Sequence, residues 1–119
     1  MDWKLDDGRP IWVQLAENLT RRIVSGQYPP GSRLPAVREL AQEAGVNPNT
    51  MQRALAQLET DGLAASNRTA GRTVTEDAAV LENTRRHLAR QNIAFYLNSM
   101  AQLGYDADQA AALLKEVRE

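Results

Sequence analysis

The segment from Gly45 to Leu55, GVNPNTMQRAL, carries more short hydrogen-bonding side chains than the start of a helix requires. One capping residue is enough to accept from the free N–H groups of a first turn, and Asn47 suits that role. Pro48 suits the first helical position, where its missing N–H is harmless. Four further polar side chains are not needed as a cap, namely Asn49, Thr50, Gln52 and Arg53. For Thr50, a hydrogen bond to the backbone that braces the turn is the competing interpretation. Because amides can pair with adenine edges and arginine with guanine, the segment is suited to contact with bases.

The same segment separates polar from apolar side chains at helical spacing. The predicted buried face consists of Met51, Ala54, Leu55 and Leu58. The opposite face holds Asn49, Arg53, Ala56 and Thr60, flanked by Thr50, Gln52 and Gln57. It lacks the Glu and Lys pairs that are typical of a solvated helix. A major groove about 12 Å wide accepts one helix, and the N–H groups at a helix N-terminus can hold a phosphate. We therefore expect this helix to lie against DNA.

The charged residues give two opposing indications. The 119-residue chain has a formal net charge of -1, whereas nucleic-acid-binding domains usually carry a basic surface. The basic residues from position 33 to position 72 are all arginine, namely Arg33, Arg38, Arg53, Arg68 and Arg72. Arginine suits bidentate contact with phosphate or guanine. For Arg38, a surface ion pair with Glu39 or Glu43 is the competing interpretation.

The elements that would position these residues are three helices and a hairpin. Apolar spacing and turn residues predict helices over 10–25, 36–44 and 48–61. Weak strand character over 63–66 and 72–75, with NRTAG between, predicts a small β-hairpin. Three helices followed by a hairpin, with a tight connection between the second and third helices, predict a winged helix-turn-helix domain over 1–77. The expected fold class is mainly α with a small β-hairpin.

Residues 78–119 predict a separate helical pair. The first helix has no Pro or Gly before Gly104, and Asp106 with Gln109 has the spacing of a capping box at the start of the second. The expected buried stripe of that second helix is Ala110, Leu113, Leu114 and Val117. Two helices of about 40 residues rarely fold stably without a disulfide, a metal or a partner chain. We therefore expect 78–119 to be a dimerisation domain of a symmetric homodimer.

Several functional classes lack sequence support. The chain has no cysteine, and its one histidine, His87, cannot supply a zinc site or a catalytic triad. Neither GxGxxG nor the P-loop pattern occurs, so no cofactor and no enzymatic activity are expected. No apolar run approaches 18 residues, so we expect no membrane segment and a cytoplasmic location. Phe95, Tyr96, Met100 and Tyr105 could line an effector pocket, although helix packing or a dimer core explains them more simply.

The run from Pro29 to Asp77 resembles the DNA-binding domain of GntR-family bacterial transcription regulators. The family pattern is PxGxxLPSxRxLAxxxGVxxxTVxxAxxxLxxxGxL, followed by a glycine-containing wing that ends in Val. The positions in register are Gly31, Leu34, Pro35, Arg38, Leu40, Ala41, Gly45, Val46, Thr50, Ala54, Leu58, Gly62 and Leu63. The tail is too short for the family's larger effector domains. Its segment LGYDADQAAALL resembles the YtrA-type branch, whose tail dimerises.

The resemblance implies a set of DNA contacts. Arg38 matches a family arginine that reaches the DNA, often at guanine. The implied recognition-helix contacts are Asn47, Pro48, Asn49, Thr50, Gln52 and Arg53, and the implied wing contacts are Arg68, Gly71 and Arg72. Three departures from the pattern bear more on the implied wing contacts than on the fold: Ala36 for Ser, Thr69 for Gly and Thr73 for an aromatic residue.

The function implied by the resemblance is that of a dimeric transcription regulator. We expect a repressor that binds a pseudo-palindromic operator in double-stranded DNA. A small effector of unknown identity could release it by changing the angle between the two DNA-binding domains. The alternative is a winged-helix module that binds another protein without binding DNA, and the slightly negative net charge is its best support.

Overall fold

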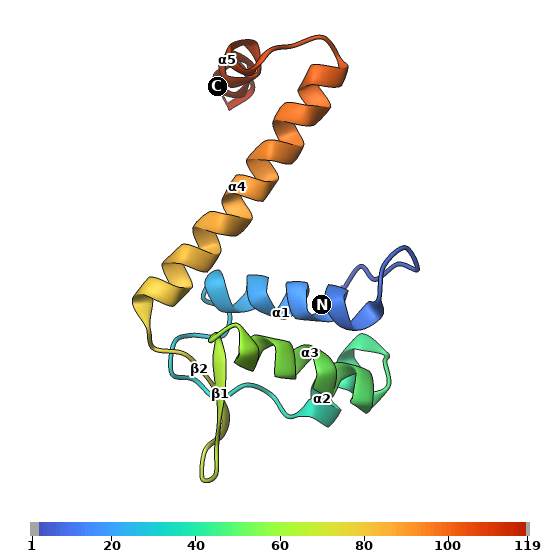
Figure 1. The fold of residues 1–119 in the computed structure, drawn as a ribbon, viewed down its shortest axis with the longest axis vertical. Coiled ribbons are helices and arrows are strands. Elements are labelled where there is room, and N and C mark those ends of the chain that lie inside the picture. The colour runs from blue at the N-terminus through green and yellow to red at the C-terminus, as the bar shows by residue number, and fades with distance from the viewer. Residues whose placement is uncertain (1–2, 119) are drawn as a thin grey trace. The chain divides into compact units, whose positions relative to one another are not determined.

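The computed structural model describes residues 3–118, which form five helices and one two-stranded antiparallel sheet. The elements, shown in Figure 1, are α1 (Ile11–Val24), α2 (Val37–Ala44), α3 (Pro48–Thr60), β1 (Ala64–Asn67), β2 (Gly71–Val74), α4 (Ala78–Gln102) and α5 (Ala107–Arg118). The expected fold class, mainly α with a small β-hairpin, is confirmed. Pro10 and Ala36 each precede a helix instead of starting one, because both have extended backbone angles. By its internal contacts the chain forms two units, with the boundary between Arg85 and Arg86.

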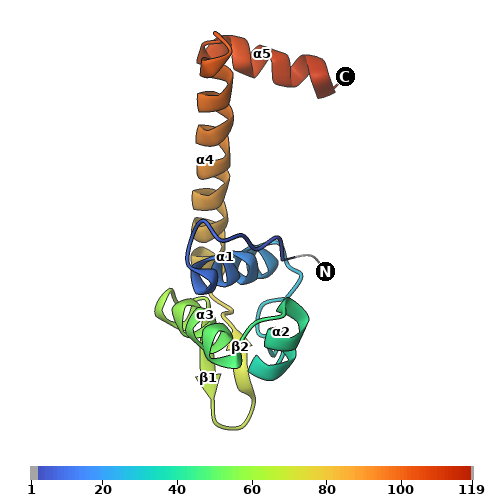
Figure 2. The ribbon, with the colours of Figure 1, turned by 90° about the vertical axis from the view of Figure 1, so that its right-hand side faces the viewer.

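The first unit has a hydrophobic core between α1, α2, α3 and the hairpin. Its fully buried side chains include Leu15, Leu19, Leu40, Leu55 and Leu58. Helix α3 packs against α1, α2 and β1, so it lies at the centre of the unit. Figures 1 and 2 both show α1 on the side of α3 that faces away from the hairpin turn. One face of α3 is thus buried in the core, and its opposite face is exposed to solvent.

The connection between α2 and α3 is the tight turn that the sequence predicts. Gly45 ends α2 with φ 72°, a left-handed conformation that glycine adopts without steric cost. The next N–H, from Val46, donates to the carbonyl of Ala41 at 3.0 Å. Asn47 then caps α3, and its Oδ1 accepts from the N–H of Asn49 at 2.8 Å. The expected N-cap is therefore confirmed, and the turn sets the direction in which α3 begins.

The hairpin is fixed to the body of the unit at both ends. Leu63, three residues after the end of α3, is buried and donates its N–H to the carbonyl of Leu58 at 2.9 Å. The strands pair from Ala64 opposite Val74 to Asn67 opposite Gly71, one residue from the predicted ranges. On its outer edge β2 also bonds to the segment before α2, where the N–H of Leu34 donates to the carbonyl of Arg72. The hairpin is therefore the wing of a winged helix-turn-helix.

The second unit contains the rest of α4 and all of α5. The predicted capping box is confirmed, since Asp106 and Gln109 each accept from the other's backbone N–H, at 2.8 and 2.9 Å. The hydroxyl of Tyr96 donates to the carbonyl of Ala110 at 2.6 Å and ties α4 to α5. Ala110 is the one fully buried residue that the structure describes in this unit.

The predicted buried stripe of α5 is wrong for the single chain beyond Ala110. Leu113 is half-buried, while Leu114 and Val117 are 55% and 84% exposed. On α4, Phe95 and Ile93 are likewise 75% and 56% exposed. The physical reason is that a pair of helices offers each helix only one neighbour. The second unit therefore presents apolar side chains that its own chain does not cover.

Membrane insertion and metal binding can both be checked against the described residues. No helix in that range is long and apolar enough to cross a membrane. Within the same range, no three His, Asp or Glu side chains lie close enough together to hold a metal ion. His87 lies on α4 and is exposed.

Replacing Leu55 by Ala should destabilise the first unit by about 2–5 kcal/mol, because the truncation leaves a cavity where α3 meets the core. The free energy of urea unfolding measures this effect. The matched control is Ala56→Ser, one residue further along α3 on its exposed side, which should change stability by at most about 0.5 kcal/mol. Equal effects of the two substitutions would contradict the assignment of the buried face.

Candidate nucleic-acid interface

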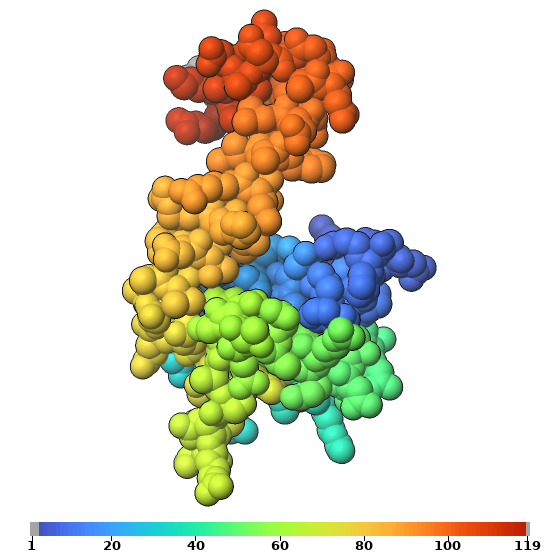
Figure 3. Space-filling view, viewed as in Figure 1, coloured from blue at the N-terminus to red at the C-terminus, as the bar shows by residue number. Residues whose placement is uncertain are grey.

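The first two turns of α3 present a polar surface that the rest of the first unit leaves open. Asn49, Gln52 and Arg53 are exposed, whereas the adjacent residues Met51 and Ala54 are buried. In the described part of the chain, the side chains of Asn49 and Gln52 have no hydrogen-bond partner. No carboxylate lies on α3 before Glu59. In Figure 3 the atoms of α3, in green, are uncovered on the face turned to the viewer. The amide groups are therefore free to meet an external partner.

The residues at the start of α3 divide into structural and free groups. Asn47 is exposed, but its side-chain oxygen is engaged in capping. Pro48 is the first helical residue and is also exposed. Thr50 is half-buried, and within residues 3–118 its hydroxyl makes no hydrogen bond that could brace the turn. A bracing role of Thr50 is therefore not seen, and its hydroxyl remains available.

Arg38 lies on α2 and is exposed. The competing interpretation of this residue is an ion pair with Glu39 or Glu43. Glu43 instead pairs with Arg22 at 3.0 Å, and none of the ion pairs in the described range involves Arg38 or Glu39. The Arg38 guanidinium therefore keeps its donors free.

The wing presents a second group of free cations. Arg68 lies in the exposed turn between β1 and β2, and the side chain of Asn67 stabilises that turn by accepting from the N–H groups of Thr69 and Ala70. Gly71 has φ 76°, and a Cβ atom there would lie 3.2 Å from Nε of Arg33. The glycine thus allows the Arg33 guanidinium to lie against the wing. Figure 3 shows the hairpin projecting from the body of the first unit.

Arg72 differs from the other arginines of this surface. It donates to Glu59 at 3.2 Å, and the side chains of this pair are only 17% and 29% exposed. The hydroxyl of Ser66 donates to the same carboxylate at 2.6 Å. These contacts, Ser66 first and Arg72 after it, hold the pKa of Glu59 below its usual value. Arg72 thus ties β2 to α3, and its expected contact with DNA stays a prediction.

Arg53 has an aromatic partner on another helix. Its guanidinium lies 4.3 Å from the ring centroid of Trp12, near the start of α1. Among the described residues it makes no ion pair. A cation over an aromatic face is stabilised while its N–H donors stay free at the edge.

The structure brings together most of the residues that the sequence singled out. Recognition-helix residues Asn49, Gln52 and Arg53 share one exposed face, and Arg38 and Arg68 are exposed on the adjoining elements. Arg33 and Trp12 were not among the predicted site residues. Arg33 could have been suspected from its charge, whereas the pairing of Trp12 with Arg53 gives no signal in the sequence because the two helices meet only in the folded unit.

Comparison with known proteins gives the same family by three routes. The model of the family described as bacterial regulatory proteins, gntR family, matches residues 12–74. An uncharacterized HTH-type transcriptional regulator of Bacillus subtilis, YhcF, is 30% identical over the whole chain and 98% of its own length. The B. subtilis repressor YtrA is also 30% identical, over 92% of this chain and 80% of its own. The predicted resemblance to YtrA-type regulators is thereby confirmed.

Solved structures are similar over the same range. A GntR-family transcriptional regulator from Listeria monocytogenes has a TM-score of 0.84 and 35% identity, covering 94% of this chain and 98% of that one. The DNA-binding domain of AraR, solved with operator ORX1, has a TM-score of 0.54 and 29% identity over 60% of this chain and 88% of its own. The relatives are transcriptional regulators, which confirms that the chain is not an enzyme. The chain belongs to the GntR family of bacterial transcriptional regulators, which are DNA-binding proteins, and the match to the family model lies within its first unit, a winged helix-turn-helix.

Proposed function

We propose that the protein is a dimeric repressor whose α3 enters the major groove of a pseudo-palindromic operator. The observation that carries this proposal is the open face of α3, where Asn49, Gln52 and Arg53 are exposed above a fully buried apolar side. Short side chains at the start of a helix allow its backbone to approach the base edges. Asn49, Thr50 and Gln52 supply hydrogen-bonding groups for the bases, and Asn47 and Pro48 lie close to the sugar-phosphate backbone of the DNA.

The cations around α3 would fix its position on the duplex. Arg38 reaches a base or phosphate from α2, and Arg68 approaches the minor groove from the wing, with Gly71 allowing the close approach. Phosphate contacts position a protein on DNA and supply most of its non-specific affinity. The net charge of the whole chain matters less, because salt screens charges beyond about 8 Å under physiological conditions.

The second unit would join two copies. Its exposed apolar side chains, Ile93, Phe95, Leu103, Leu114 and Val117, are what a dimer interface buries. A two-fold dimer would place two α3 helices in major grooves about 34 Å apart, one turn of the double helix. The proposed functional division is 1–77 for DNA binding and 78–119 for dimerisation, with its boundary at the start of α4, whereas the internal contacts divide the chain between Arg85 and Arg86. Repression is supported by the relative YtrA, which is a transcriptional repressor. The same proposal includes a small effector that regulates the protein and a cytoplasmic site of action.

Replacing Arg38 by Ala should weaken binding to an operator duplex by about 1–3 kcal/mol and relax the base preference, because a specific arginine contact is lost. Titration of labelled duplexes at several salt concentrations measures both effects. Arg21→Ala is the matched control, since it removes an exposed arginine from the last turn of α1. A folded dimer that binds no duplex even at low salt would favour the alternative function, a protein-binding module.

Two substitutions at the base of the wing test the role of Arg72. We expect Arg72→Ala and Glu59→Gln to lower stability by about 0.5 kcal/mol each and to weaken DNA binding to a similar small extent, because each releases the wing from α3. Urea unfolding and duplex titration provide the two measurements. At neutral pH the pair is intact, and it is lost only as the pH falls through the lowered pKa of Glu59. A much larger loss for Arg72→Ala, with a smaller dependence on salt, would instead establish a direct contact with DNA.

Placing a charge on the exposed apolar surface should separate the two copies. Phe95→Asp should convert a dimer into monomers in analytical ultracentrifugation, since burial of the carboxylate opposes association. The same variant should lose more than about tenfold in operator affinity, because the two half-sites are no longer bound together. Asn98→Asp adds the same charge at an exposed polar position of α4 and is the control. An unmodified protein that is monomeric at micromolar concentration would refute the proposed dimer.

A further inference from the structure

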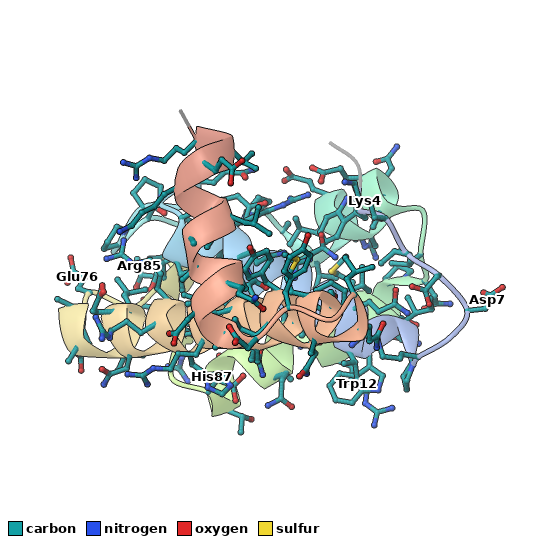
Figure 4. The ribbon with its side chains drawn as sticks, turned by 90° about the horizontal axis from the view of Figure 1, so that it is seen from above. Lys4, Asp7, Trp12, Glu76, Arg85 and His87 are labelled. Carbon is teal, nitrogen blue, oxygen red and sulfur yellow. The ribbon has the colours of Figure 1, made fainter. Side chains whose placement is uncertain are left out.

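Trp12 is a large aromatic side chain that the hydrophobic core does not use. It is half-buried, and it belongs neither to the core cluster nor to the partly buried apolar side chains packed on it, although its neighbour Ile11 does pack there. Figure 4 shows the ring of Trp12 at the outer edge of α1. Its described partner is the Arg53 guanidinium, 4.3 Å from the ring centroid. A stabilising role in the core therefore does not account for this residue.

A second tryptophan in the same unit shows what a structural pairing looks like. Arg22 lies 4.0 Å from the ring centroid of Trp3, and both side chains are about 95% buried. Arg22 also donates to the hydroxyl of Tyr28 and to Glu43, so it ties together the N-terminal segment, α1 and α2. Arg53 is by contrast exposed and without an ion pair among the described residues. The Trp12 pairing holds a guanidinium in place while leaving its donors free.

The direction of this pairing indicates which part of DNA Arg53 would meet. Arg53 lies one turn after Asn49 on α3, and its guanidinium rests on α1, the helix packed beside α3. It therefore lies at the flank of α3, not at its leading end. When a helix lies in the major groove, its flanks face the two sugar-phosphate backbones, and its N-terminal residues face the bases.

We propose that Trp12 is a positioning residue of the DNA interface: its indole face holds the Arg53 guanidinium in the orientation in which Arg53 contacts a backbone phosphate. This inference rests on the proposed DNA-binding role of α3. A free arginine side chain loses rotamer freedom when it binds, and a side chain already held on an aromatic ring loses less. The ring also stabilises the positive charge without accepting a hydrogen bond from it, which a carboxylate partner would do.

The test is a double-mutant cycle on the whole 119-residue chain with Trp12→Leu, Arg53→Ala and the two combined. The probe is a labelled duplex of about 30 base pairs and mixed sequence at low salt, because a phosphate contact also contributes to non-specific binding. A duplex selected from a randomised pool by the unmodified protein is the second probe. We expect Trp12→Leu to weaken binding to both duplexes by about threefold to fivefold, the range of an exposed cation–aromatic contact. In the Arg53→Ala background the same change should have no further effect.

Further measurements distinguish positioning from a general loss of structure. Trp12→Phe keeps an aromatic face and should retain most of the affinity. The Nε–Hε resonance of Arg53, displaced by the ring current of Trp12, should move toward its free position in Trp12→Leu, while the unfolding midpoint stays close to that of the unmodified protein. Arg53→Ala should reduce the salt dependence by about one phosphate without changing base preference.

Four results would overturn the inference. An equal loss from Trp12→Leu in the Arg53→Ala background would mean that the ring acts without Arg53. Tighter binding by Trp12→Leu would mean that the ring holds Arg53 away from DNA. Unchanged affinity of Trp12→Leu would show that the pairing has no role in binding. Failure of the unmodified protein to bind any duplex would refute the proposed function itself, and that result is distinct from a failure limited to the variants.

Discussion

The burial of one face of α3 is the constraint on which the interface depends. Met51, Ala54, Leu55 and Leu58 are fully enclosed between α1, α2 and β1, so α3 can neither rotate about its axis nor slide without opening the core. Since a helix has a fixed angle between successive residues, burying these four positions determines that Asn49, Gln52 and Arg53 face outward. The core therefore fixes the direction in which the polar face points, although that face contributes little to the core's stability.

Short-range contacts account for the parts of the fold that the sequence could predict. The cap formed by Asn47, the capping box of Asp106 with Gln109 and the left-handed glycine after α2 all involve residues within a few positions of one another. Their geometry depends on local backbone angles, which residue type largely specifies. The same holds for the hairpin, whose ranges were predicted to within one residue.

Contacts between elements distant in the sequence were beyond such prediction. The tie from Arg72 to Glu59 and the contact of Trp12 with Arg53 depend on how β2 and α1 pack against α3. For this reason the sequence grouped Arg72 with the free arginines, and its helical spacing placed Trp12 on the apolar stripe of the first helix, whereas the structure leaves Trp12 outside the core cluster. The periodicity of α5 shows that its apolar residues share a face, but it does not tell which chain covers that face. Among the described residues of this unit only Ala110 is enclosed. The pattern therefore identifies a face that needs a partner without identifying the partner.

The distribution of ion pairs resolves the apparent conflict between an acidic chain and a DNA-binding surface. In the part of the chain that the structure describes, four carboxylates pair with arginines, Glu17 with Arg9, Glu43 with Arg22, Glu59 with Arg72 and Glu82 with Arg85. None of these pairs uses Arg33, Arg38, Arg53 or Arg68, which lie on or beside the helix-turn-helix and the wing. A net charge counts paired and unpaired groups alike, whereas a phosphate interacts with the local potential, to which an unpaired guanidinium contributes most. Four of the fifteen carboxylates of the chain are thus held by other arginines, while the four unpaired guanidinium groups give the candidate interface a local positive charge that the net charge does not reveal.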